Sequence, residues 1–373
     1  MIARMRPFAT QWTTLVPPLA VILLVFTWGR ELPGGIVAVA TLVLAGAVLA
    51  AVHHAEVVAH RVGEPFGSLV LAVAVTVIEV ALIVTLMMDG GDKSATLARD
   101  TVFAAVMITC NGILGLSLLV GSLRHGTAVF NSEGSGSALA TVATLATLSL
   151  VLPTFTTSKP GPEFSSVQLT FAAVTSLVLY GLFVATQTVR HRDYFLPVPR
   201  QEKQEKGDTS AGPVEEHAEA PSARTALISL GLLGLALIGV VGLAKGVSPA
   251  IESAVDTAGL PHAIVGVIIA LLVLLPETIA AVRAARRDQV QISMNLALGS
   301  AMASIGLTIP AVALASLWLT GPLILGLGST HMVLLLLTVL VSALTVVPGR
   351  ATPLQGGVHL VLLAAYLELA INP

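Results

Sequence analysis

Apolar stretches about as long as a membrane is thick recur along the whole chain, separated by short groups of Pro, Gly and charged residues. About twenty consecutive apolar residues suffice for a membrane-spanning helix, so each stretch predicts one span. The stretches are continuous instead of alternating over about ten residues, which excludes a transmembrane β-barrel. We expect eleven helices, at residues 11–28, 33–59, 66–88, 100–122, 136–156, 166–189, 225–247, 262–284, 291–319, 322–347 and 354–371.

A polar segment divides these helices into two groups. Residues 191–224 are rich in Arg, Glu, Lys, Gln and Pro, so we expect a solvated cytoplasmic linker. Its acidic residues match no EF-hand spacing. The linker leaves an N-terminal helix at 1–32 and two groups of five helices, at 33–190 and 225–373. Because five is odd, the second group crosses the membrane in the opposite sense, which predicts an all-α polytopic fold with two inverted five-helix repeats.

Composition and charge narrow the class of protein. Apolar residues make up 55% of the chain and charged residues 11%, which excludes an ordinary soluble globular protein. No basic face suggests a nucleic-acid partner, and membrane lipid is the expected surrounding. The one cysteine, Cys110, excludes an intramolecular disulfide and a thiolate metal cluster.

Lys and Arg are distributed unevenly between the two sides of the predicted membrane. If the N-terminus is cytoplasmic, 14 of the 19 basic residues lie in cytoplasmic segments. We therefore expect an integral protein of a bacterial inner membrane, with the N-terminus and the linker in the cytoplasm.

Two acidic residues interrupt the apolar pattern at matching positions. Glu79 lies in the second helix of the first group and Glu277 in the second helix of the second group. Counted at 1.5 Å per residue from the nearest polar boundary, both lie roughly 14–15 Å deep, near the middle of a core about 30 Å thick. A carboxylate at that depth costs several kcal/mol, so the pair predicts a functional site. The alternative is a buried acid with a structural role only.

Amide and hydroxyl groups in the third helix of each group lie at similar depth: Asn111 in the first, Asn295 and Ser300 in the second. Carboxylate, amide and hydroxyl oxygens suit hard cations such as Ca²⁺ or Na⁺, whereas Zn²⁺ or copper would favour imidazole and thiolate. Pro276 removes a helix hydrogen bond beside Glu277 and frees a carbonyl that can face an ion. Close helix packing is the alternative for Asn111 and Ser300.

Two further polar sets have less specific interpretations. Glu56 and His60, beside His53 and His54 at the cytoplasmic end of the second helix, are candidates for a proton path, or they bond one another at the interface. The fourth helix of each group carries hydroxyls on one face, which either line the ion path or bond to their own helix. These hydroxyls are Ser137, Thr141 and Thr144 in the first group, and Thr338, Ser342 and Thr345 in the second.

Two motifs make the chain resemble a known family. GEPFGSLVLAVAVTVIEVALI at residues 63–83 and LPETIAAVRAARRDQVQISMNLALGSAMASIGLTIP at residues 275–310 are similar to the repeats of the calcium/cation antiporter superfamily, in its bacterial calcium/proton and sodium/proton branch. The resemblance implies alternating access, with Glu79 and Glu277 as the metal and proton carriers and with further oxygens from residues around Asn111, Asn295 and Ser300. The Gly-Asn element that plant and fungal exchangers carry before each acid is absent here.

We therefore expect an antiporter that exchanges Ca²⁺, or Na⁺ or K⁺, for H⁺ and needs no cofactor. Carboxylates that hold either a cation or protons are the physical basis of such exchange. A Na⁺/Ca²⁺ exchanger is the alternative within transport. An intramembrane hydrolase would require a motif such as His-Glu-x-x-His, which the sequence lacks. A non-transporting membrane protein would not require matched acids, and the sequence leaves the oligomeric state open.

Overall fold

The computed structural model describes residues 12–30, 32–63, 66–89, 95–198, 221–318 and 321–373. Ten helices of this part are long and apolar enough to span a membrane, and a shorter apolar helix precedes them. The predicted all-α fold with eleven helices is therefore confirmed. The elements are α1 (Trp12–Thr27), α2 (Gly34–Val62), α3 (Phe66–Asp89), α4 (Leu97–Met107), η3 (Ile108–Ile113), α5 (Leu114–His125), β1 (Ala128–Val129), α6 (Ser132–Ala146), η4 (Thr147–Val151), α7 (Leu152–Phe155), α8 (Ser166–Ala185), η5 (Thr186–Arg190), η6 (Arg192–Phe195), α9 (Ala223–Thr257), α10 (Ala263–Arg286), α11 (Val290–Ala315), α12 (Ser329–Val346), β2 (Arg350–Ala351) and α13 (Pro353–Ile371).

Three spans of the first group contain a π-helical turn. Element η3 joins α4 to α5, η4 joins α6 to α7, and η5 ends the span of α8. A π turn holds one more residue than an α turn and appears mostly as a single turn, often near functional sites. The polar residue Asn111 lies within η3, so its side chain points in a different direction from the one that a regular α-helix would give it.

Two predicted helix boundaries are wrong by seven residues or more, and the others differ by four residues or fewer. Helix α9 continues ten residues past the predicted end at 247, to Thr257, because Pro249 and the polar residues around it are accommodated inside the helix. The window at 322–347 becomes helical only at Ser329. Its first part, residues 322–328, has no regular secondary structure and bonds to other segments through its backbone: Ile324 N donates to Ala95 O (3.1 Å) and Leu327 N to Leu150 O (2.8 Å).

The predicted linker at 191–224 is only partly visible. Residues 199–220, which include all of its acidic residues except Asp193, lie outside the described part of the chain. Before them, η6 forms a short helical turn whose Phe195 is buried against the ring of Phe183, at 5.7 Å between ring centroids. Phe195 therefore anchors this part to the helices, while most of the other residues from 191 to 198 are exposed.

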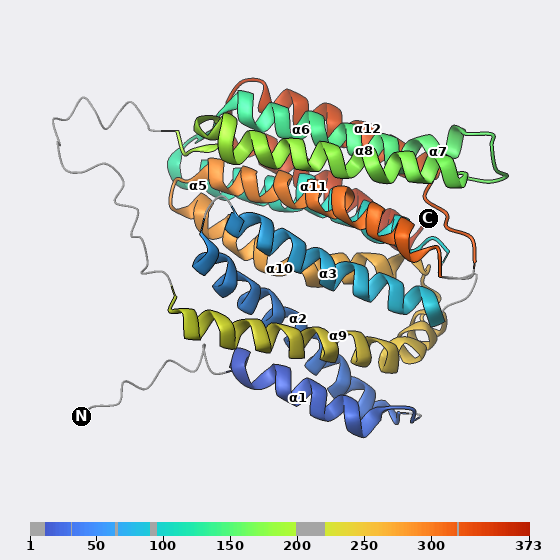
Figure 1. Cartoon of the computed structure of the whole chain (residues 1–373). Helices are drawn as coiled ribbons and strands as arrows, with labels where there is room; N and C mark the ends of the chain where they lie inside the picture. The colour runs from blue at the N-terminus through green and yellow to red at the C-terminus, as the bar shows by residue number, and fades with distance from the viewer. Residues whose placement is uncertain (1–11, 31, 64–65, 90–94, 199–220, 319–320) are drawn as a thin grey trace, which may run out of the picture.

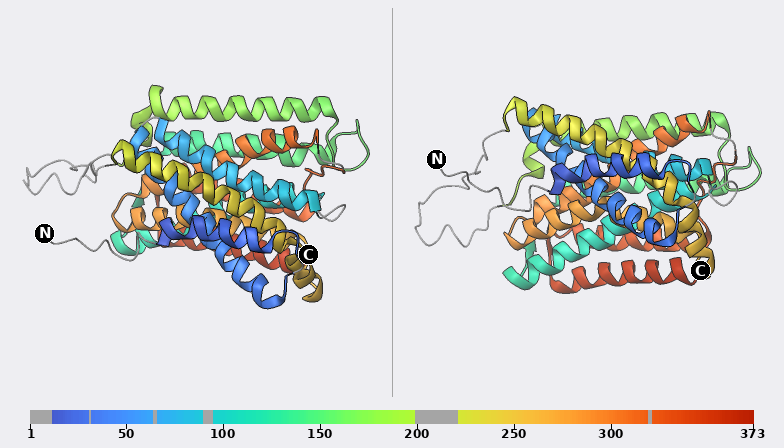
Figure 2. Two further views of the ribbon diagram at one scale, coloured as in Figure 1. Left: turned by 60° about the horizontal axis from the view of Figure 1, so that its bottom comes forward. Right: turned by 90° about the horizontal axis from the view of Figure 1, so that it is seen from below.

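The helices form a layered bundle (Figures 1 and 2). Helices α1, α2 and α9 pack on one another at one side, and α3 and α10 lie between them and the remaining helices. Glycines allow the close contact between α1 and α9: a Cβ at Gly239 would lie 2.7 Å from the Cβ of Ala20. Small residues serve this purpose widely in membrane helices, because they let two backbones approach.

The two groups of helices also meet at the end of the bundle from which the linker leaves, which we call the linker end. There β1 pairs antiparallel with β2, Ala128 opposite Ala351. We call the opposite end, where α3 and α11 end and α10 and α12 begin, the far end.

Candidate ion-binding site

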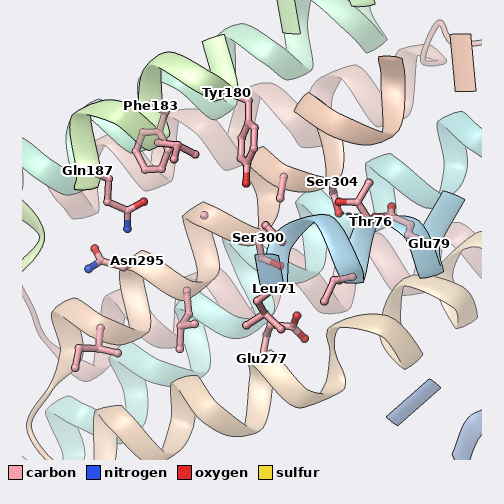
Figure 3. A pocket seen from close by; sticks show the side chains of 17 residues that line it. Leu71, Thr76, Glu79, Tyr180, Phe183, Gln187, Glu277, Asn295, Ser300 and Ser304 are labelled. Atoms are coloured by element: carbon pink, nitrogen blue, oxygen red, sulfur yellow. Dashed lines mark hydrogen bonds between the residues drawn. The ribbon is translucent and has the colours of Figure 1, made fainter. Parts of the chain in front are cut away.

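Glu79 and Glu277 line the same cavity, although 198 positions separate them in the sequence. Helix α3 supplies Glu79 and helix α10 supplies Glu277, while α8 and α11 form the other walls (Figure 3). The cavity has a volume of about 230 Å³, room for an ion with several water molecules. Its polar lining consists of Thr76, Glu79, Tyr180, Gln187, Glu277, Asn295, Ser300 and Ser304.

The carboxyl group of Glu79 is buried and only partly satisfied. The side chain is 2% exposed. Its Oε2 accepts a hydrogen bond from Ser304 Oγ on α11 (3.0 Å), and the Thr308 hydroxyl one turn further along α11 lies beside it. Its Oε1 has no hydrogen-bond partner. Since leaving a buried polar atom unpaired is unfavourable, this oxygen is suited to bind a proton or a cation.

The carboxyl group of Glu277 also has one oxygen without a hydrogen-bond partner. Its Oε2 is buried without a hydrogen-bond partner. Pro276 has no N–H, so the carbonyl of Leu272 lacks its usual partner one turn earlier. The charge of Glu277 interacts with those of Glu79 and Glu56. Each of the two acids therefore presents an unpaired oxygen inside the protein.

The cavity extends from the two acids toward the linker end. In Figure 3, Glu79 and Ser304 lie together on one side, Ser300 and Glu277 near the middle, and the amides of Asn295 and Gln187 on the other side. Helix α11 begins, and the span of α8 ends, at the linker end. A path lined by hydroxyl and amide groups thus leads from the acids toward that end.

Asn295 lines the cavity, but other protein groups already bind its carboxamide. Its Nδ2 donates to the carbonyl of Phe195 (2.7 Å), and its Oδ1 accepts from Gln291 Nε2 (2.8 Å). Ser300 also lines the cavity. The structure therefore brings four of the predicted site residues to one cavity: Glu79, Glu277, Asn295 and Ser300.

Asn111 lies in a different place, a buried polar cluster formed with α12 and α13. Its Nδ2 donates to Thr338 Oγ1 (2.9 Å), and its Oδ1 is 3.1 Å from His359 Nδ1. Because Oδ1 can only accept, Nδ1 of His359 carries the proton, and Nε2 then accepts from Thr345 Oγ1 (3.2 Å). A ligand role for Asn111 stays a prediction from sequence; in this structure its carboxamide joins three helices.

The two hydroxyl faces also lie away from the cavity. Ser137, Thr141 and Thr144 each donate to a carbonyl four residues earlier in their own helix. On α12, Thr338 and Thr345 belong to the cluster around Asn111. Neither set is part of the described cavity lining.

The polar residues at the linker end of α2 lie near the cavity but outside its lining. His54 is buried, and its Nε2 donates to the carbonyl of Thr13 (2.9 Å); Pro17, one turn later, has no N–H with which to bond that carbonyl. Glu56 is half-buried and His60 exposed. The charge of Glu56 interacts with those of His53, His60 and Arg283 on one side and that of Glu277 on the other.

Several residues of the cavity were not predicted. Ser304 follows Ser300 by one helical turn, and Thr308 follows by two, so the i, i+4, i+8 pattern could have revealed them. Thr76 precedes Glu79 by three residues on the same face of α3. Tyr180 comes from α8 and Gln187 from η5, which ends the same span. The sequence of this span gives no sign of which helix it packs against.

The cavity presents oxygen ligands and no cluster of typical metal-binding side chains among the described residues. In the part of the chain that the structure describes, no three His, Cys, Asp or Glu side chains come together. The lining instead combines two carboxylates with hydroxyl and amide groups, and it includes no Lys or Arg. Such oxygen ligands bind Ca²⁺, Na⁺ or protons and release them readily.

Comparison with known proteins supports a transport role for this arrangement. The ionic transporter y4hA of Sinorhizobium fredii is 46% identical over 97% of this chain and 96% of its own length. The sodium-potassium/proton antiporter ChaA of Escherichia coli is 35% identical over 95% of each chain. A crystal structure of the Ca²⁺/H⁺ antiporter protein YfkE has the same fold, with a TM-score of 0.67 at 16% identity over 97% of this chain and 99% of that one.

The family described as sodium/calcium exchanger protein matches residues 32–189 and 228–372, which contain both acids, the walls of the cavity and nearly all described helices. The superfamily to which the two sequence motifs point is thereby confirmed. The chain belongs to the sodium/calcium exchanger protein family.

Proposed function

We propose that the protein is a secondary active transporter, and no enzyme, that exchanges a cation for protons at Glu79 and Glu277. The observation that carries the proposal is the pair of carboxyl groups in one cavity, each with a buried, unpaired oxygen and with no Lys or Arg in the lining. Two negative charges in a low-dielectric site must be neutralised. Either a bound cation or bound protons can neutralise the two carboxylates, but the site cannot hold a divalent cation and two protons at the same time.

Competition between the two ligands gives the exchange. Protons that bind Glu79 and Glu277 remove the charge that attracts the cation, and a bound cation displaces the protons. If the site opens to one side of the membrane at a time, each opening exchanges one ligand for the other. The proton gradient then drives cation export.

The transported cation is proposed from the ligands and the relatives together. Carboxylate and hydroxyl oxygens suit Ca²⁺ and Na⁺. The relative from Escherichia coli is named for Na⁺, K⁺ and H⁺, and YfkE for Ca²⁺ and H⁺. We propose Ca²⁺ as the cargo, with Na⁺ or K⁺ as further substrates; a Na⁺/Ca²⁺ exchanger is the alternative that the family's name supports.

The distribution of basic residues supports placement in a bacterial inner membrane with the linker end in the cytoplasm. The cavity extends from Glu79 and Glu277 toward Asn295 and Gln187, hence toward that end. In this orientation the structure represents the inward-facing state, in which the site exchanges ligands with the cytoplasm.

Glu56 and His60 are proposed as a proton path on the side of Glu277 that faces α2. Glu56 interacts electrostatically both with Glu277 and with His60, which is exposed at the linker end. Neither Glu56 nor His60 lines the cavity. Protons would thus reach Glu277 by a route that the cation does not use.

Transport in everted membrane vesicles tests the proposed function. The cytoplasmic face is outside in such vesicles, so added Ca²⁺, Na⁺ or K⁺ meets the inward-facing cavity directly. We expect at least Ca²⁺ to dissipate an imposed pH gradient in a saturable way, because each cation that enters the site releases protons. If none of the three ions dissipates the gradient, the antiporter proposal is wrong. Calcium uptake driven by sodium without a pH gradient would support the exchanger alternative.

The proposed proton path gives a separate prediction for Glu56→Gln. We expect the maximal exchange rate to fall several-fold, while the cation concentration at half-maximal rate stays unchanged, because Glu56 does not line the cavity. Initial rates of pH-gradient dissipation over a range of cation concentrations measure both values. Glu133→Gln, at an exposed acid of the same end, is the matched control. A change in half-saturation with an unchanged maximal rate would instead make Glu56 part of the cation site.

A further inference from the structure

A continuous chain of hydrogen bonds joins three segments at the linker end of the cavity. Asn131 N, at the start of α6, donates to Gln291 Oε1 (2.7 Å), and Gln291 Nε2 donates to Asn295 Oδ1 (2.8 Å). Asn295 Nδ2 then donates to the carbonyl of Phe195 in η6 (2.7 Å). The chain therefore runs from a backbone N–H through two carboxamides of α11 to a backbone carbonyl.

The two ends of this chain fix the direction of every bond in it. A backbone N–H can only donate a hydrogen bond, and a backbone carbonyl can only accept one. Gln291 must therefore turn its oxygen toward Asn131 and its NH₂ group toward Asn295. Asn295 in turn accepts with Oδ1 and donates with Nδ2, so its carboxamide cannot turn over without breaking two hydrogen bonds.

Gln291 is a member of the chain that does not line the cavity. Its side chain is 1% exposed, whereas Asn295, one turn further along the same face of α11, belongs to the cavity lining. Burying a carboxamide is unfavourable unless its polar atoms are bonded, so packing alone would favour an apolar residue at position 291. The bond to Asn295 gives the glutamine a reason to be there.

Helix α6 needs the bond from Gln291 because it cannot complete a capping box of its own. Asn131 is the N-cap of α6, and in a capping box the third helical residue bonds back to the N–H of the N-cap. That third residue is Gly134, where a Cβ would overlap the carbonyl oxygen of Tyr194. The glycine lets η6 approach α6, and Gln291 supplies from α11 the bond that a side chain at position 134 would make.

The carboxamide of Asn295 keeps some bonding capacity for the cavity. It has two acceptor sites and two donors, and the chain uses one of each, so one lone pair of Oδ1 is left. In Figure 3, Asn295 lies near Gln187, on the side of the cavity away from Glu79. A cation that moves from the linker end toward the acids exchanges water for oxygen ligands of this kind, and an oxygen already held in place binds at a smaller entropic cost.

We propose that Gln291 is a positioning residue for the cation: it holds the carboxamide of Asn295 so that the remaining lone pair of Oδ1 is a ligand on the way to Glu79 and Glu277. The inference rests on the proposed antiport, because a cation path is needed only if a cation is carried. Without Gln291, the carboxamide can turn and present its NH₂ group to the cation. Cation binding is then weaker, although both acids are intact.

A double-mutant cycle in the full-length protein tests this role. Asn295→Ala removes the oxygen, Gln291→Met removes the bond that holds it, and a third variant carries both substitutions. Initial rates of pH-gradient dissipation in everted vesicles, over a range of Ca²⁺ concentrations, give the half-saturating concentration. We expect each single substitution to raise it about three- to tenfold, the effect of roughly one hydrogen bond. Because Gln291 acts through Asn295, the double variant should equal Asn295→Ala.

The matched control is Gln168→Met near the start of α8, at the far end. Gln168 has the same bonding pattern, since its Oε1 accepts from the backbone N–H of Ser165 (2.9 Å) and its Nε2 donates to Ser158 Oγ (2.9 Å), but it does not line the cavity. Half-saturation should be unchanged in this variant. If Gln291→Met is not recovered as folded protein, Gln291→Glu replaces it: the acceptor for Asn131 stays, and the cycle cancels the effect of the added charge, which is present with and without the Asn295 side chain.

Two results would overturn the positioning role while leaving the antiport proposal in place. One is an unchanged half-saturation in either single variant. The other is a double variant in which the two single effects multiply, because Gln291 would then act independently of Asn295. A parent protein that exchanges no cation would overturn the antiport proposal and the positioning role together, so the two kinds of failure are distinguishable.

Discussion

Replacement of Glu277 by Gln is expected to abolish cation/proton exchange while leaving the protein folded. Glutamine has the same shape but can neither bind a proton nor neutralise a cation. At an effective dielectric constant of 20, a unit charge about 4 Å away contributes roughly 4 kcal/mol, and about 1.4 kcal/mol corresponds to a tenfold change in binding. The cation affinity should therefore fall by at least about 100-fold, as measured by pH-gradient dissipation in everted vesicles.

The control for this substitution is Glu368→Gln on α13, an exposed acid that bonds to Asn372 near the end of its helix. It should transport like the unmodified protein. Glu79→Gln should resemble Glu277→Gln, because the two carboxyl groups act on one ion. Exchange that persists above a tenth of the normal rate in Glu277→Gln would show that this acid does not carry the ion.

Filling the cavity from Gly299 is expected to block transport by sterics alone. A Cβ there meets no atom within 4 Å, and Gly299 lines the cavity, so we expect a leucine side chain at this position to occupy part of the cavity. The substitution should not destabilise the fold, since glycine within a helix is about 1 kcal/mol less favourable than alanine or leucine. We expect Gly299→Leu to reduce exchange at least about tenfold with an unfolding temperature equal to or above that of the parent, measured in detergent.

Gly181→Leu on α8 is the matched control, because a Cβ at Gly181 also has no neighbour within 4 Å but the residue does not line the cavity. Transport in this variant should be unchanged. Normal exchange by Gly299→Leu would mean that ions reach Glu79 and Glu277 by another route.

The two acids could be located from the sequence because their signal is physical and repeated. A carboxylate within an apolar helix is unfavourable wherever it lies, and the same distance to a polar boundary in both groups placed Glu79 and Glu277 at one depth. The structure adds that they line one cavity and that an oxygen of each is unpaired. Those facts depend on how α3, α10 and α11 cross, which depth alone does not determine.

Asn111 shows the limit of that reasoning. Counting residues from the polar boundary gives the depth of Asn111 in the membrane. The direction of its side chain, however, follows from the count only if the helix is a regular α-helix. Element η3 is a π turn, and His359 and Thr338 supply partners from helices more than two hundred positions away. Likewise, the apolar window at 322–347 was predicted as one helix, because hydropathy does not distinguish a helix from an irregular apolar segment such as 322–328, whose backbone bonds to Ala95 and Leu150. Contacts with distant parts of the chain determine both the surroundings of Asn111 and the structure of residues 322–328.

The three π turns have a mechanical consequence. They all lie in the first group of helices, and the described helices α9–α13 contain none. Converting one π turn to an α turn moves the rest of its helix along by one residue and rotates it by about 100°. Among the described helices, this way of shifting a helix along its axis is therefore available only to the first group. If helices shift in this way, the conformations open to the two sides of the membrane are not related by the symmetry of the two groups, even though the sequence patterns of the groups match.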